Sequence, residues 1–282
     1  MHQSPMEMTF AYFILHALLL LQFSLRSNAR EIIEKHVGND YTHSGNLKED
    51  HHGPHGLDPT LSVFFRVGDL YLGKKMPICF AAYDNSNPTH LLSQDEANSI
   101  PFSSSKLPYL LEFFSIPKNS PQAKAMEATL NQCEHKPAKG EVKFCANSLE
   151  SMMDMTLGVL GKVKPKVLTT KIFSSNHTFF QNYTFVKKPL EIYASKKVAC
   201  HAMAYPYKVY YCHGHKGHTD RLFKIDLHGE NGERVDAIAV CHMDTSMWDS
   251  NHIAFRVLGV QPRSSPVCHF LPPDNLAWIP SA

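Results

Sequence analysis

Apolar positions recur at helical spacing through much of the first half of the chain. In residues 147–161 (NSLESMMDMTLGVLG) they return every three or four positions, which predicts an amphipathic helix whose methionines fill a core. Ser93 and Glu96 have the spacing of a capping box, and Ser120 is followed by proline at the first helical position. These start signals predict two further helices, so the N-terminal half should be mainly helical.

In the C-terminal half, short runs of β-branched and aromatic residues alternate with turn residues, which is typical of antiparallel strands. The clearest hairpin covers residues 221–242. Asn231 and Gly232 suit a two-residue type I′ turn, and that loop length predicts that Ile225 pairs with Ile238.

The N-terminus has the pattern of a secretory signal. Residues 10–23 (FAYFILHALLLLQF) are an apolar run followed by small residues up to Ala29, which predicts a signal peptide over 1–29. The run is shorter than the ~20 residues of a spanning helix, so a membrane anchor is the weaker alternative and no membrane span is expected after cleavage. Residues 30–60 are polar and histidine-rich and predict a flexible leader, whereas residues 61–282 predict one folded domain.

Composition narrows the function further. Lysine and arginine number 28 and aspartate and glutamate 26, so a net charge of +2 provides no field for binding nucleic acid. Asn176 and Asn182 each begin an N-glycosylation sequon, as expected for a secreted protein of the apoplast or a vacuole. The sequence carries no signal for the oligomeric state.

The candidate chemistry lies in four Cys-His dipeptides, at residues 200–201, 212–213, 241–242 and 268–269. Successive strand residues point to opposite sides of a sheet, so each sulfur can face a disulfide while the imidazole faces the other side. A three-residue loop around Pro206 would place Cys200 opposite Cys212, whereas a two-residue loop would not. The predicted fold class is therefore α+β, with helices in the N-terminal half and a disulfide-stapled antiparallel β-sheet carrying the Cys-His pairs in the C-terminal half.

Metal binding by these dipeptides is one of two interpretations. No CxxC motif is present, which argues against a structural zinc finger. If the sulfurs form disulfides, imidazole remains as the main ligand type, and it suits copper, zinc and nickel. The alternative is that each histidine is an ordinary sheet residue with no metal.

The spacing of the pairs adds a family resemblance. Gaps of ten, 27 and 25 residues separate successive pairs, and the pattern resembles the CH-x10-CH-x25-27-CH-x25-26-CH signature of the plant BURP domain. Segments such as YPYKVYYCH (205–213) and PVCHFLPPDNLAWIP (266–280) extend the resemblance over roughly residue 61 to the C-terminus.

The resemblance implies a function. Some BURP proteins are copper-dependent peptide cyclases (burpitide cyclases of RiPP biosynthesis), in which copper oxidises a tyrosine or tryptophan side chain and dioxygen takes up the electrons. The resulting radical forms a crosslink within a ribosomal precursor peptide. The resemblance implies copper ligands at His201, His213, His242 and His269. It also implies disulfides among Cys133, Cys145, Cys200, Cys212, Cys241 and Cys268, which leaves Cys79 outside the pairs.

Neighbouring residues could support this site. Asp244 could orient a ligand imidazole, although ordinary turn hydrogen bonding is an equal alternative. His252 is a weaker ligand candidate, and His215 and His218 are expected in an exposed loop.

The substrate is expected to be a separate precursor peptide containing tyrosine or tryptophan, because Tyr41 is the only such residue in the leader and thus a lone possible self-substrate. The competing interpretation is a non-enzymatic secreted cell-wall or stress-associated BURP protein that binds a polysaccharide or a wall enzyme.

Overall fold

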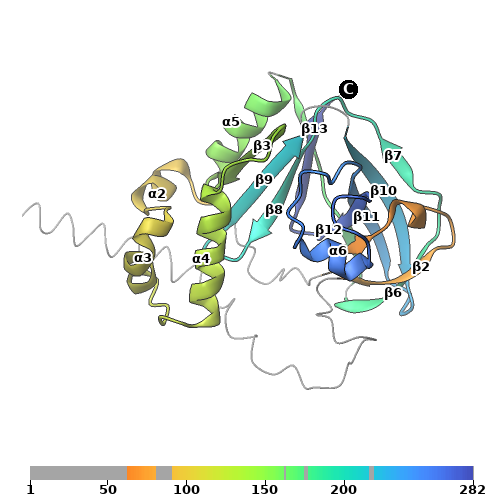
Figure 1. The fold of residues 1–282 in the computed structure, drawn as a ribbon, viewed down its shortest axis with the longest axis horizontal. Helices are drawn as coiled ribbons and strands as arrows, with labels where there is room; N and C mark the ends of the chain where they lie inside the picture. The colour runs from red at the N-terminus through yellow and green to blue at the C-terminus, as the bar shows by residue number, and fades with distance from the viewer. Residues whose placement is uncertain (1–61, 81–90, 162, 175–176, 216–218, 282) are drawn as a thin grey trace, which may run out of the picture. The chain divides into compact units, whose positions relative to one another are not determined.

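The computed structural model describes residues 62–80, 91–161, 163–174, 177–215 and 219–281. The predicted signal peptide and leader, together with Tyr41, Asn176 and His218, lie outside the described residues. The prediction of an α+β fold is confirmed, but the strands form two antiparallel sheets rather than one (Figure 1).

The larger, eight-stranded sheet consists of β1 (Phe64–Phe65), β2 (Lys75–Cys79), β5 (Lys171–Phe173), β6 (Phe180–Phe185), β7 (Leu190–Ile192), β10 (Asp220–Gly229), β11 (Arg234–His242) and β12 (Val267–Leu271). Its main order is β1-β12-β11-β10-β6-β2, while β5 pairs with β11 and β7 with β10.

The smaller, five-stranded sheet consists of β3 (Glu141–Ala146), β4 (Pro165–Leu168), β8 (Val198–Met203), β9 (Val209–His215) and β13 (Leu276–Pro280), in the order β3-β9-β8-β13-β4. Strands from the two ends of the domain thus share sheets, since β1 pairs with β12 and β13 with β8.

Short polar signals set the helix starts. The helices are α2 (Gln94–Ser99), α3 (Leu107–Phe113), α4 (Pro121–Glu134), α5 (Leu149–Leu160) and α6 (Ile253–Leu258), with single 3₁₀ turns η2 (Val67–Asp69) and η3 (Ser104–Lys106). Ser93 and Glu96 form the predicted capping box of α2, and the Ser120 hydroxyl accepts a hydrogen bond from the Ala123 amide at the start of α4. The pattern did not predict α3 and α6, which have only seven and six residues. None of the described helices has the length and apolar content needed to cross a membrane.

Three of the apolar clusters among the described residues define how the two sheets are covered. The cluster between the sheets is made of Ala199, Leu222, Ile238, Val240, Leu271, Ala277 and Ile279. Cys200 and Cys212 belong to a second cluster, in which α5 covers the other face of the smaller sheet. Cys241 and Cys268 belong to a third cluster, on the other face of β11 and β12. The cysteines therefore lie on the faces that point away from the contact between the sheets.

Three disulfides join Cys133 to Cys145, Cys200 to Cys212 and Cys241 to Cys268. The second and third connect residues directly opposite each other on neighbouring strands. These two disulfides lie on one face of the paired strands, as the alternation argument predicts.

The 221–242 hairpin differs from the prediction by one residue. Only Gly232 has a positive φ, of 84°, so the loop is not a type I′ turn, which needs two such residues. The Gly229 amide donates to the Glu233 carbonyl, which makes a three-residue loop. Ile225 consequently pairs with Ala237, and the predicted pairing with Ile238 is wrong.

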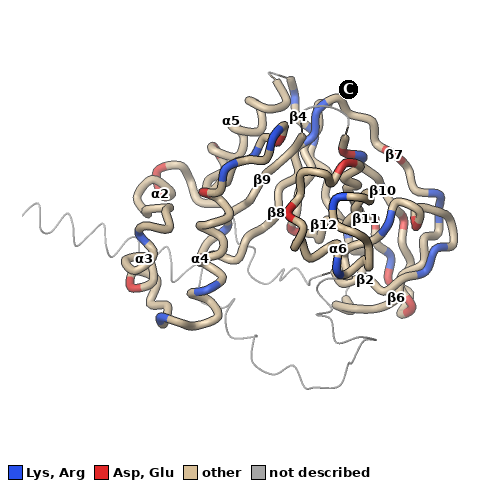
Figure 2. The backbone as a smooth tube through the Cα atoms, viewed as in Figure 1, with Lys and Arg blue, Asp and Glu red and all other residues tan. Residues whose placement is uncertain are grey.

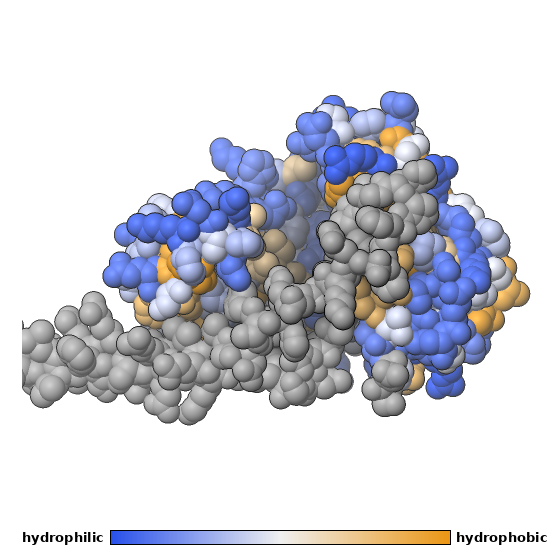
Figure 3. Space-filling model, turned by 90° about the horizontal axis from the view of Figure 1, so that it is seen from below, coloured by the Kyte–Doolittle hydropathy of each residue, from blue (hydrophilic) through white to orange (hydrophobic). Residues whose placement is uncertain are grey.

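Neither positive nor negative charge predominates over the described part of the chain. Acidic and basic positions are interspersed along the described chain (Figure 2), and the face drawn in Figure 3 is largely hydrophilic with scattered apolar residues. Of the two sequons, Asn182 is half-buried on β6, and its side-chain amide donates to Glu230 at 3.2 Å.

Candidate metal centre

Both pairs of Cys-His dipeptides lie on neighbouring antiparallel strands in the same register. Cys200 lies opposite Cys212 in the β8–β9 pair, and Cys241 lies opposite Cys268 in the β11–β12 pair. The paired strands run in opposite directions, so the histidine after one cysteine lies on one side of the cysteine pair and the histidine after the other cysteine lies on the other side. The two histidines are therefore diagonal neighbours. Diagonal positions remain within reach of long side chains. The order Cys-His on both strands therefore brings two imidazoles together on the face opposite the disulfide.

The two strand pairs turn these faces toward each other. His201, His213, His242 and His269 continue the apolar cluster between the sheets, and we call these four side chains the histidine cage. Successive ring centroids around the cage are separated by 5.3 Å (His201–His213), 5.8 Å (His213–His242), 5.5 Å (His242–His269) and 5.5 Å (His269–His201). The structure thus brings all four predicted ligand residues together from two different sheets.

The Nε2 atoms of His242 and His269 face each other with their lone pairs. Nδ1 of His242 is 2.9 Å from the Asp220 carboxylate, and Nδ1 of His269 is 3.2 Å from the Phe270 carbonyl oxygen. Both partners only accept, so each Nδ1 carries the proton and each neutral ring has a bare Nε2. The two Nε2 atoms lie 3.3 Å apart. Two bare nitrogens at this distance repel each other unless a cation lies at the site.

His201 and His213 form the second pair, with Nε2 atoms 3.2 Å apart. Glu141, on β3, supports it: its carboxylate lies 3.5 Å from Nδ1 of His213 and accepts a hydrogen bond from the Tyr211 hydroxyl at 3.3 Å. Burial alone would raise the pKa of Glu141, but the hydrogen bond with His213 and that from the Ala138 amide outweigh it and lower the pKa to about 2. An ionised carboxylate thus holds the His213 ring with Nε2 toward the cage.

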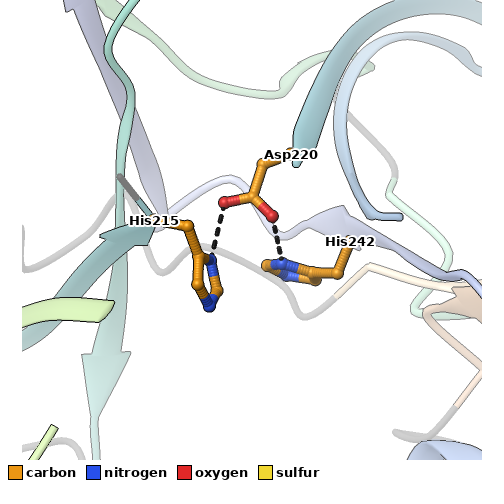
Figure 4. A group of neighbouring side chains, drawn as sticks. All are labelled: His215, Asp220 and His242. Atoms are coloured by element: carbon orange, nitrogen blue, oxygen red, sulfur yellow. Dashed lines mark hydrogen bonds and ion pairs between the residues drawn. The ribbon is translucent and has the colours of Figure 1, made fainter. Parts of the chain in front are cut away.

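Asp220 performs the same role for the other sheet. Its carboxylate lies between two imidazoles, 2.9 Å from Nδ1 of His242 and 2.9 Å from Nδ1 of His215 (Figure 4). Burial would raise the pKa of Asp220, but its hydrogen bonds with His215 and His242 outweigh burial and lower it. Ligand atoms of these three residues all lie within 4.8 Å of one another, so the group could hold a metal ion.

The sequence analysis missed both His215 and Asp220. His215 was expected in an exposed loop, but it ends β9 and its side chain is only 21% exposed. Asp220 lies directly opposite His242 only because of the three-residue hairpin loop, whereas the predicted register would have placed Arg221 there. The role predicted for Asp244 therefore falls to Asp220, because Asp244 is exposed and accepts a hydrogen bond from the Ser246 amide instead.

His252 caps α6 rather than joining the cage. Its Nδ1 accepts a hydrogen bond from the Ala254 amide at 3.3 Å, so in the neutral ring Nε2 carries the proton. Burial lowers the pKa of His252, which favours this neutral form. The ring lies against Trp248, with centroids 4.5 Å apart, and Trp248 in turn contacts His242 at 5.1 Å.

Three of the four cage rings have lowered pKa values. Burial is the largest cause that lowers the pKa of His201 and of His242, and it lowers the pKa of His269 to about 3. Neighbouring imidazoles lower the pKa of these three rings further. Neutral imidazole is the form that binds transition metals, so these three rings could bind an ion without first losing a proton near neutral pH.

A cleft gives access to the cage. It has a volume of about 960 Å³, and all four cage histidines line it together with Tyr211 and Trp248. Lysines of the segment between α4 and β3 line one side, and Asp244 and Asp249 of the segment after β11 also contribute. A space of this size accommodates a ligand or a short peptide segment beside the cage.

One prediction concerns His215 in the metal-free protein. The hydrogen bond with Asp220 raises the pKa of His215, although burial opposes the shift. A raised folded-state pKa means that this contact stabilises the fold fully below the ordinary value of 6.5 and less as pH rises through the folded-state pKa. His215→Gln should therefore cost about 1.5 kcal/mol of unfolding free energy at pH about 5.5 and clearly less at about 9, measured by urea denaturation. His228→Gln, an exposed change on β10, should show no such trend, and a pH-independent cost for His215→Gln would contradict the prediction.

Comparison with known proteins finds relatives over most of the chain. A family profile described as BURP domain matches residues 63–280, a span that runs from β1 to β13. BURP domain-containing protein BNM2A of Brassica napus is 48% identical over 228 residues, which cover 79% of this chain and 80% of that protein. BURP domain protein USPL1 of Arabidopsis thaliana is 48% identical with coverage of 79% and 81%. BURP domain protein RD22 of Arabidopsis thaliana is 40% identical over 224 residues, which cover 79% of this chain and 56% of that protein.

Proposed function

Because the chain belongs to the BURP-domain family, we propose that it is a copper-dependent enzyme that oxidatively crosslinks a tyrosine or tryptophan side chain within a peptide substrate. The observation that carries the proposal is the pair of bare Nε2 atoms of His242 and His269, 3.3 Å apart, with their Nδ1 protons held by oxygen acceptors. A cation bound between these atoms would remove the repulsion of their lone pairs, and the lowered pKa values of the same rings disfavour a proton in that position.

The donor set fits a transition-metal ion of the kind that imidazole binds, copper among them. Two nitrogens that bind one tetrahedral ion at the ~2.0–2.1 Å found in zinc sites lie about 3.3 Å apart. The Nε2 separations within the two pairs are 3.2 Å and 3.3 Å. Imidazole ligands suit copper, zinc and nickel, and copper binds most tightly in that series. The three disulfides are typical of an oxidising compartment, in which Cu(II) is available.

Bound copper would supply one-electron oxidation, with dioxygen as the final electron acceptor. The chain itself supplies position. Asp220 and Glu141 hold the protons on Nδ1 of His242 and His213, so the lone pairs stay directed into the cage. Such outer partners fix the orientation of a ligand ring and increase its basicity. The cleft, which Tyr211 and Trp248 line together with the cage histidines, would accommodate the aromatic side chain of a substrate beside the cage.

The substrate would be a separate precursor peptide in the secretory pathway, the apoplast or a vacuole. The predicted leader offers Tyr41 alone as a target. A cleft lined by both acidic and basic side chains suits a peptide better than a uniformly charged polymer.

The test combines metal analysis with mass spectrometry. The protein secreted from plant cells should contain copper in stoichiometric amount, and incubation with tyrosine- or tryptophan-containing precursor peptides should remove two hydrogens per crosslink. The mass change should require both copper and dioxygen, and the zinc-loaded protein should give none because zinc has no redox chemistry.

The two parts of the proposal fail separately. Absence of copper binding would refute the metal site. Bound copper without any mass change across a broad peptide library would refute the cyclase activity and favour a non-enzymatic role in binding a polysaccharide or a wall enzyme.

A further inference from the structure

Trp248 is in ring contact with the cage and also lines the cleft. Its indole centroid lies 5.1 Å from that of His242 and 4.5 Å from that of His252. Indole is one of the most easily oxidised side chains, and its ring makes an edge contact with His242 and a tilted contact with His252. A half-buried indole in this position connects the cleft with a cage histidine that is itself only 2% exposed.

The segment that carries Trp248 is held firmly although it forms neither helix nor strand. The Trp248 amide donates to the Thr245 carbonyl at 3.0 Å, and the Arg263 guanidinium donates to the Trp248 carbonyl at 2.8 Å. Thr245 is buried, and its hydroxyl donates to the Ser265 carbonyl at 2.9 Å. These bonds hold the backbone of Trp248 beside the cage, and the ring contacts with His242 and His252 position the indole.

We propose that Trp248 is a redox relay that passes single electrons from a substrate in the cleft to the metal ion in the cage. This inference rests on the proposed function. In the step, Trp248 gives one electron to Cu(II), which becomes Cu(I), and the indole becomes a cation radical. A substrate phenol then returns one electron to the indole, its O–H bond breaks, and its proton passes to water in the cleft. The sum is one electron moved from the phenol to copper, with no bond to Trp248 made or broken.

The chain contains a matched control. Trp278 is the second of its two tryptophans and lies on β13, in the cluster beneath α5 on the face that points away from the cage. Trp278 is 6% exposed, so burial differs from that of Trp248, but it belongs to the same domain and experiences the same solution. Because Trp248 is the more exposed of the two, the zinc-loaded chain is the second control: it keeps the exposure of Trp248 and removes the redox chemistry.

The first measurement uses the full chain loaded with Cu(II), with dioxygen but with neither peptide nor added reductant. Without a peptide, no substrate can reduce the oxidised indole of Trp248. Peptide mapping should therefore find oxygen added to Trp248 and not to Trp278. A precursor peptide that is crosslinked should suppress this oxidation, and zinc loading should abolish it. Absence of oxidation at Trp248, or equal oxidation of both tryptophans, would overturn the relay.

The second measurement separates electron transfer from a structural role. Under anaerobic conditions, Trp248→Phe should bind copper in normal amount but reduce it with bound peptide about tenfold more slowly, as followed by loss of the Cu(II) electron paramagnetic resonance signal. Trp248→Tyr keeps an oxidisable ring and should restore much of the rate. Wild-type reduction rates in Trp248→Phe would refute the relay while leaving the copper site intact, whereas failure of the wild-type chain to bind copper would refute both proposals.

Discussion

His242→Ala should bind copper at least about 100-fold more weakly than the wild-type chain, because loss of an outer partner of a ligand already costs about 10–100-fold. The substitution removes one of the two Nε2 atoms that face each other at 3.3 Å, and it leaves Asp220 holding only His215. Crosslinking should fall below detection. Isothermal titration with Cu(II) and the peptide mass assay measure the two effects.

Two further variants make this prediction decisive. His213→Ala removes a cage ligand that is less deeply buried, at 15% side-chain exposure, so it guards against misfolding as the cause of lost binding. His228→Ala changes an exposed histidine on β10, outside the cage, and should retain wild-type affinity. If His242→Ala and His213→Ala both bind copper as the wild type does, the cage is not the metal site.

The double variant Cys241→Ala/Cys268→Ala should lose about 3.5 kcal/mol of unfolding free energy in the chain-entropy model, given a sequence separation of 27 residues. For a domain of this size the loss corresponds to a fall of about 10 °C in melting temperature. The change should also weaken copper binding, because the disulfide fixes the two strands whose opposite faces carry His242 and His269.

Calorimetry of the metal-free protein and copper titration measure both effects. Cys79→Ala is the matched control, since Cys79 is equally buried but outside the three disulfides. It should affect copper affinity little. A double variant that loses stability yet keeps full copper affinity would show that the strands hold the histidines in place without the disulfide.

The candidate site could be predicted from the sequence to the extent that it depends on strand alternation. Alternation predicted that each sulfur and imidazole lie on opposite faces, and the four histidines that the family resemblance implied as ligands converge in the structure. The loop around Pro206 gave the correct pairing of Cys200 with Cys212, because loop length fixes register. These features depend on local geometry, which the sequence specifies strongly.

The remaining parts depend on contacts between distant segments. Asn231-Gly232 favours a two-residue turn, but the structure has a three-residue loop there. This difference of one residue in loop length places Asp220 opposite His242. His215 and Asp220 meet from the ends of β9 and β10, which belong to different sheets, so their spacing of five residues showed no recognisable pattern. The division into two sheets likewise depends on which strands pair at a distance, and periodicity contains no information on that choice.

The distribution of the cage over two sheets has a mechanical consequence. Each close Nε2 pair comes from strands of one sheet, and the two strand-to-strand disulfides likewise stay within one sheet each. Between the sheets, the described side chains meet mainly through the small apolar cluster that the cage continues. An ion held by all four rings would therefore join the two sheets, in addition to the hydrogen bond between His215 and Asp220 that already connects them.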